Sequence, residues 1–120
     1  MLIGCSNNPT DVNVSNELYG TWVFSSYDNG VTVMKRAYQF EDNNSGFHIM
    51  SNGGFVERKN SGGCATPPIS YTNFDGTWKP KDNNLVAINV GYWGGIQNYD
   101  IQIISLNYME LKFTREFINE

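Results

Sequence analysis

The chain has 120 residues, a formal net charge of −4, 17% charged residues and 14% aromatic residues, values that suit a single domain. The acidic balance excludes a nucleic-acid binder, because no basic surface would neutralise a row of phosphates, and no stretch of about 20 apolar residues could form a transmembrane helix. Few charges together with many aromatic and turn-forming residues favour an extracytoplasmic all-β domain.

The N-terminus reads Leu2-Ile3-Gly4-Cys5, followed by a polar tract up to residue 16. This run resembles a lipobox, at which a signal peptide is cut before a cysteine that then receives lipid. We expect residues 1–16 to be a lipobox remnant and flexible tether, with lipid on Cys5, and residues 17–120 to form the domain. A free Cys5, or a disulfide between Cys5 and Cys64, are the alternatives, and the cysteine count does not choose between them.

Eight short strands are predicted along the rest of the chain. Glycine- or asparagine-rich turns arrive every 8–12 residues, and apolar residues do not recur at helical spacing. Alternation is clear near the C-terminus, where Tyr99, Ile101 and Ile103 share one face, as antiparallel strands over a one-sided core require. The predicted strands are Tyr19–Tyr27, Val31–Phe40, Gly46–Met50, Gly54–Lys59, Ile69–Lys79, Leu85–Trp93, Tyr99–Leu106 and Tyr108–Glu116.

The connections between these strands predict the architecture. Only the segment 60–70, which contains two prolines, reads as an irregular loop or edge. The other connections are short turns, so each strand is expected to pair with the next. A meander of eight strands avoids exposed edges by closing, and the fold class predicted is an eight-stranded antiparallel up-and-down barrel.

A Gly-Thr-Trp triplet occurs twice, at residues 20–22 and 76–78. We expect each triplet to open a strand that starts a four-strand half of the barrel. Gly20 and Gly76 would let another backbone approach, while Trp22 and Trp78 would point inward and plug one end.

Two of these motifs carry a resemblance to a family. Gly20-x-Trp22 in the first strand and Thr114-Arg115-Glu116 in the last strand resemble the lipocalin and wider calycin group, over residues 17–117. The chain looks closest to the small lipocalin-like domains of bacterial lipoproteins. The resemblance implies that Arg115 stacks on Trp22 and closes the barrel floor, in a cation–π contact worth about 0.5–2 kcal/mol.

Catalysis has little support in the sequence, and we expect no enzyme activity, no metal and no cofactor. The single histidine, His48, lies in an alternating strand, and no second histidine or cysteine stands at ligand spacing. Two clusters of charges, Lys35-Arg36 and Glu57-Arg58-Lys59, each fit a solvated strand face.

Binding remains as the expected activity, because an eight-stranded barrel is either filled by side chains or holds one small ligand. We expect a non-catalytic protein, lipid-anchored in the envelope of a Gram-negative bacterium, at its outer membrane, that carries a small hydrophobic ligand. The alternative is a filled barrel that docks on an envelope protein complex through the loops around Cys64 and Trp93. The candidate ligand-binding residues are Tyr38, Phe40, Phe47, Tyr71, Tyr92, Trp93 and Tyr99.

Overall fold

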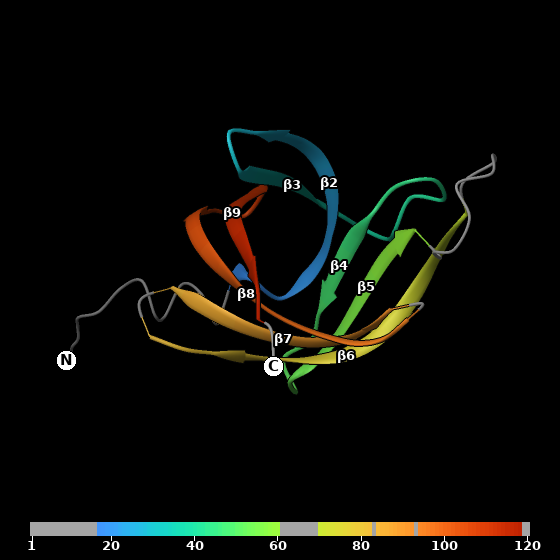
Figure 1. Cartoon of the computed structure of the whole chain (residues 1–120). Helices are drawn as coiled ribbons and strands as arrows, with labels where there is room; N and C mark the ends of the chain where they lie inside the picture. Colours follow the sequence, from blue (N-terminus) through green and yellow to red (C-terminus); the bar gives the residue numbers. More distant parts are fainter. Residues whose placement is uncertain (1–16, 61–69, 83, 93, 119–120) are drawn as a thin grey trace.

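The structure is a computed structural model that describes residues 17–60, 70–82, 84–92 and 94–118. All the elements described there are strands, and they close into one antiparallel barrel (Figure 1). The strands are β2 (Gly20–Asp28), β3 (Val31–Ala37), β4 (Gly46–Ile49), β5 (Gly54–Asn60), β6 (Tyr71–Pro80), β7 (Leu85–Tyr92), β8 (Gly95–Leu106) and β9 (Glu110–Phe117).

The all-β, eight-stranded closed barrel predicted from the sequence is confirmed, with one change in strand order. The order around the barrel is β2-β3-β9-β8-β7-β6-β5-β4. Strands β4 to β9 follow one another as a meander, as expected. Strand β3, however, pairs with β9, and β2 lies between β3 and β4. The connection 38–45 therefore crosses β2 instead of forming a tight turn (Figure 1).

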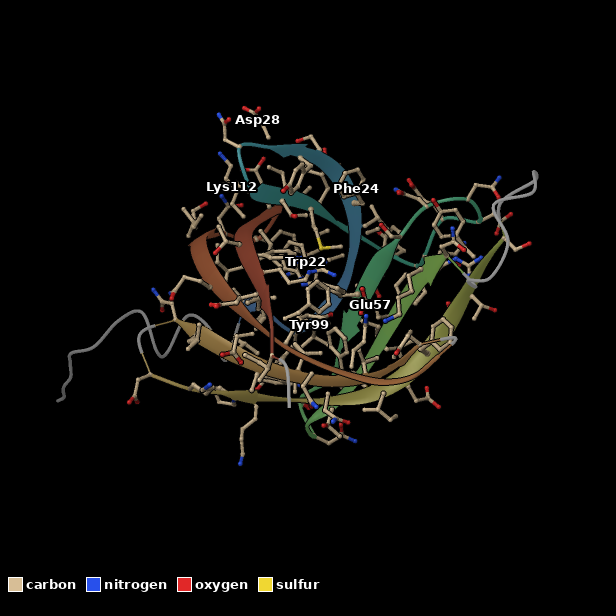
Figure 2. All side chains as sticks on the ribbon, viewed as in Figure 1. Trp22, Phe24, Asp28, Glu57, Tyr99 and Lys112 are labelled. Carbon is tan, nitrogen blue, oxygen red and sulfur yellow. The ribbon has the colours of Figure 1, made fainter. Side chains whose placement is uncertain are left out.

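The interior of the barrel is filled with large apolar side chains. They come from alternate positions of the strands, because successive residues of a strand point to opposite faces. Figure 2 shows Trp22, Glu57 and Tyr99 inside the ring of strands, and Asp28 and Lys112 outside it. The buried apolar cluster comprises Leu18, Trp22, Met34, Phe47, Ile49, Phe55, Trp78, Val86, Ile88, Val90, Tyr99, Ile101, Ile103, Leu111 and Phe113.

The two Gly-Thr-Trp triplets do not mark two similar halves. Gly20 opens β2, as predicted, but Gly76 lies in the second half of β6. The close backbone approach expected at Gly76 is present, since a Cβ there would lie 2.7 Å from Val90 Cα and closer still to the carbonyl oxygen of Asn89. The second triplet thus allows β6 and β7 to pack tightly.

Candidate functional site

At the end of the barrel where β2 begins, here called the Trp22 end, a guanidinium lies on the indole ring of Trp22. The cation is Arg36, whose Cζ is 4.3 Å from the ring centroid. Trp22 and Arg36 are direct partners across β2 and β3, so their side chains leave the sheet on the same face. The prediction that Arg115 covers Trp22 is therefore wrong, because the neighbours of β2 are β3 and β4, and β9 lies beyond β3.

Arg36 also binds the backbone around it. Its guanidinium donates hydrogen bonds to the carbonyl oxygen of Tyr19, at 2.7 Å, and to those of Glu17 and Tyr108. Gly20 leaves room for this arrangement, since a Cβ there would lie 2.5 Å from an Arg36 nitrogen. The donors of Arg36 thus bind two backbone segments, residues 17–19 and the turn at Tyr108.

Residues 17–19, here called the closing segment, cover the Trp22 end. Trp22 Nε1 donates to the carbonyl oxygen of Leu18 at 2.8 Å, and Leu18 is fully buried. Tyr19 packs edge-on against Trp78, with ring centroids 5.9 Å apart. Trp78 in turn donates to the carbonyl oxygen of Met50 at 2.7 Å. Both indole N–H groups are satisfied, and this end is closed by apolar and hydrogen-bonded contacts together.

At the opposite end, where β9 ends and which we call the Arg115 end, charged side chains line the interior. We refer to Glu57, Lys59, Gln97, Tyr99 and Arg115 as the Glu57 network. Strand β5 neighbours β4 and β6 in the wall, so its contacts with residues of β8 and β9 cross the inside of the barrel. The prediction that Glu57-Arg58-Lys59 forms a solvated face is wrong for Glu57, which is buried among these groups.

Glu57 is the centre of the network. One carboxylate oxygen accepts a hydrogen bond from the Tyr99 hydroxyl at 2.7 Å and one from Lys59 Nζ at 3.2 Å. Its other oxygen lies 3.5 Å from an Arg115 nitrogen. Lys59 also donates to Gln97 Oε1 at 3.0 Å. A buried carboxylate costs desolvation energy, and such groups are retained either for specificity of the fold or for function.

Tyr99 titrates differently from an exposed tyrosine. Burial raises the pKa of its hydroxyl well above the usual value, and the nearby carboxylate of Glu57 raises it further. The guanidinium of Arg115 acts in the opposite direction and lowers the pKa. Tyr99 therefore stays protonated and remains a hydrogen-bond donor to Glu57 at neutral pH.

The guanidinium of Arg115 lies among aromatic rings. Its Cζ is 4.8 Å from the ring centroid of Tyr99, and the rings of Phe47, Phe113 and Phe117 lie 5.7–5.8 Å away. The side chain is 27% exposed. Within the described part of the chain its guanidinium makes these ring contacts and the ion pair with Glu57, but no hydrogen bond. Apart from the nitrogen that faces Glu57, its N–H donors have no acceptor among the described residues.

The structure separates the predicted ligand-binding residues. Phe47 and Tyr99 are buried in the interior, and Tyr71 and Tyr92 are half-buried at the strand ends of the Arg115 end. Tyr38 is fully exposed at the Trp22 end, and half-buried Phe40 lies in the connection that crosses β2. These residues therefore do not form one site. Trp93, Cys5 and Cys64 lie outside the described residues.

Sequence reasoning missed Arg36, Glu57 and Lys59 as interior residues, although a signal was present. Arg36 follows Met34 by two positions, and Glu57 and Lys59 follow Phe55 by two and four. Period two places each of them on the apolar face of its strand, near the end where that face reaches the rim. Charge alone suggested solvent, whereas position on the strand was the better guide.

His48 and the acidic side chains supply no metal centre in the described ranges, where no three His, Cys, Asp or Glu residues lie together. His48 Nδ1 is 2.8 Å from Thr21 Oγ1, a contact between neighbouring strands. No helix in the part of the chain that the structure covers is long and apolar enough to cross a membrane.

No protein-family model matches the chain, and neither the curated proteins nor the solved structures compared with it include a match.

Proposed function

We propose that this chain is a non-catalytic binding protein that takes a small amphipathic anion, such as a carboxylate with a hydrophobic tail, at the Arg115 end. The observation that carries the proposal is the guanidinium of Arg115, which lies on the interior face and donates no hydrogen bond to the described residues. Guanidinium groups bind carboxylates through two parallel hydrogen bonds, and partial burial strengthens such a pair. An anionic head group would fill the open donors.

The surroundings of Arg115 suit the hydrophobic part of such a ligand. Phe117 is 50% exposed and packs edge-on against Tyr99, with ring centroids 5.3 Å apart. Lys59 lies 5.4 Å from the ring centroid of Phe74 on the other side of the network. Aromatic surface beside one or two placed polar groups is the usual composition of a small-ligand site. Because the core is filled, the ligand would lie at the mouth and not deep in the barrel.

The cellular setting belongs to the same proposal. The closed eight-stranded barrel is compatible with a lipocalin-like domain, a fold that can hold one small ligand. The Leu–x–Gly–Cys run supports lipid on Cys5, which would anchor the protein in the outer membrane of a Gram-negative envelope.

A fluorescent carboxylate tests the proposal directly. A dansyl-labelled undecanoic acid is titrated into the wild-type chain, Arg115→Gln and Lys112→Gln. Lys112 is the matched control, because it lies on the same strand, carries the same charge and has a 43% exposed side chain with its ion pair on the outside. Loss of charge-assisted hydrogen bonds should weaken binding by about 10- to 100-fold in Arg115→Gln, while Lys112→Gln should change it less than about twofold.

The methyl ester of the same probe is the second control, since it keeps the tail and removes the charge. It should bind the wild-type chain as weakly as the acid binds Arg115→Gln. Equal binding of acid and ester, or unchanged affinity in Arg115→Gln, would contradict the proposal.

The filled core favours a second candidate, a module that binds an envelope protein through its outer surface. Large apolar side chains occupy the interior, and several others are exposed on the outside, among them Tyr38, Tyr108 and Met109. Native mass spectrometry of the chain purified from its own host separates the two candidates. A small co-purifying anion supports the carrier, and a stoichiometric protein partner without such an anion supports the module.

A further inference from the structure

An exposed apolar patch lies at the Trp22 end, remote from the network around Glu57. It consists of Tyr38, Tyr108 and Met109, here called the tyrosine patch, with exposed fractions of 104%, 67% and 57%. Together with Arg36 and Ala37, these residues line a shallow recess of about 260 Å³. Exposed aromatic side chains gathered in one place mark an interaction surface more often than single ones do.

Tyr108 and Met109 of the tyrosine patch lie on a turn that is fixed by hydrogen bonds. The Asn107 side chain accepts hydrogen bonds from the backbone N–H groups of Met109, at 2.9 Å, and Glu110, at 3.0 Å. The N–H of Arg36 donates to the carbonyl oxygen of Met109 at 3.0 Å, which ties the turn to β3. The Arg36 guanidinium also lies 4.7 Å from the ring centroid of Tyr108. The exposure of these side chains is therefore part of the fold.

The chain enters the barrel beside this patch. Arg36, which stacks on Tyr108, also donates to the carbonyl oxygen of Glu17, the first described residue. Eleven residues, 6–16, separate Glu17 from Cys5. A segment of that length spans at most about 40 Å. Lipid on Cys5 would thus keep Glu17, and the tyrosine patch beside it, within this distance of the bilayer.

We propose that the tyrosine patch contacts the interfacial region of the bilayer and orients the barrel with its Arg115 end toward the aqueous phase. The inference rests on the lipid anchor of the proposed function. Tyrosine suits the membrane interface because its ring is apolar and its hydroxyl remains hydrated. The charged neighbours Lys35 and Glu110 pair with each other at 2.6 Å. Because these two charges neutralise each other, contact of the patch with the bilayer needs no anionic lipid. A chain with a net charge of −4 would not be attracted to such lipids.

The test uses the full chain fused behind the signal peptide of a bacterial lipoprotein, purified in its lipidated form and inserted into phosphatidylethanolamine–phosphatidylcholine vesicles. Cys64→Ser removes the other thiol, and a nitroxide is attached at Tyr108→Cys or, as a second variant, Tyr38→Cys. The matched control is Tyr27→Cys, which is 65% exposed in β2 near the Arg115 end. Collision of the label with oxygen and with a water-soluble nickel chelate is measured by electron paramagnetic resonance.

Labels at Tyr108 and Tyr38 should be accessible to oxygen and protected from the nickel chelate, and the label at Tyr27 should show the reverse. Equal exposure of all three labels to the chelate would overturn the bilayer contact while leaving the anchor intact. Dipolar broadening between labels at Tyr108 would assign the patch to a second copy of the chain and overturn the inference as well. An unmodified Cys5 in the mass spectrum of the N-terminal peptide would overturn both anchor and orientation.

Discussion

The two ends of the barrel each place an arginine over an aromatic ring, yet the two arginines differ in what else they bind. Arg36 lies on Trp22 and donates to three backbone carbonyl oxygens. Arg115 lies on Tyr99 with a similar separation, 4.8 Å against 4.3 Å, and makes no hydrogen bond to the described residues. Both guanidinium groups therefore make a cation–π contact. The N–H groups of Arg36 also bind backbone oxygens, whereas those of Arg115 donate no hydrogen bond to the described residues.

This difference separates a structural role at the Trp22 end from the binding role that we propose for the Arg115 end. At the Trp22 end, the guanidinium of Arg36 and the indole groups of Trp22 and Trp78 donate to backbone carbonyl oxygens, so removal of one of these side chains leaves carbonyl oxygens without partners. At the Arg115 end, Glu57 still accepts hydrogen bonds from Tyr99 and Lys59 when the Arg115 side chain is removed. The Trp22 end should thus respond to substitution by losing stability, and the Arg115 end by losing affinity for ligand.

Truncation of Trp22 should produce the largest effect. Trp22 is fully buried and contacts Arg36 and Leu18, so Trp22→Ala should lower the free energy of unfolding by about 3–5 kcal/mol. Urea denaturation measures the change. Tyr27→Ala, in the same strand but 65% exposed, is the control and should cost less than about 1 kcal/mol. Similar losses in both variants would refute the core role of Trp22.

The two arginines can be compared by the same substitution. Arg36→Gln should cost about 2–3 kcal/mol because charge-assisted hydrogen bonds to backbone oxygens are lost. Arg115→Gln should cost less, about 1 kcal/mol, since no hydrogen bond to a described residue is lost and the buried Glu57 still accepts hydrogen bonds from Tyr99 and Lys59. Urea denaturation of both variants gives the two values, and an equal or reversed order would remove the distinction between the ends.

A substitution at Gly76 tests how closely β6 and β7 pack in the wall of the barrel. Gly76→Ala should cost about 1–3 kcal/mol, because the added Cβ would press on the backbone of β7 at Asn89 and Val90. Gly91→Ala is the matched control, since its Cβ would meet Phe74 at 3.6 Å, an ordinary contact. Thermal unfolding of both variants checks the prediction, and equal midpoints would show that β6 and β7 tolerate a wider spacing.

High pH should weaken the Arg115 end in a defined window. In the unfolded chain tyrosine ionises near pH 10, whereas in the barrel the pKa of Tyr99 is raised, chiefly by burial. The contribution of the protonated Tyr99 to the free energy of unfolding is therefore fully present below about pH 10. It is lost as the pH rises toward the pKa of Tyr99 in the folded barrel. The difference in unfolding free energy between wild type and Tyr99→Phe, followed from about pH 8 to about pH 11, should shrink or change sign. A constant difference would contradict the raised pKa.

Local patterns in the sequence predicted the strands well because turns and period two depend on neighbouring residues. The turn at Asn29-Gly30, with positive φ at both residues, joins β2 and β3 as expected. The order of the strands around the barrel is harder to predict, since it depends on which strands far apart in the sequence pair at their edges. The sequence predicts strand up to Phe40 and a turn over 41–45, yet the whole connection 38–45 crosses β2. This change puts β4 beside β2 where the predicted meander would put β9, and so it separates Arg115 from Trp22.

The charged interior was harder to predict than the apolar core. Phe55, Glu57 and Lys59 share one face of β5, and the Phe55 position indicated that this face is inward. What the sequence did not reveal is that Glu57 reaches Tyr99 and Arg115 across the barrel, because such contacts require the closed ring. The candidate site therefore became visible only once the strands were placed around a common axis.

The most direct test of the difference between the ends is heteronuclear NMR of the arginine Nε–H groups, assigned with Arg36→Lys and Arg115→Lys. Slow hydrogen exchange is expected for Arg36, and fast exchange for Arg115 that becomes slow only when the dansyl-labelled acid is added. Strong protection of Arg115 without the acid, or protection of neither arginine, would contradict the account.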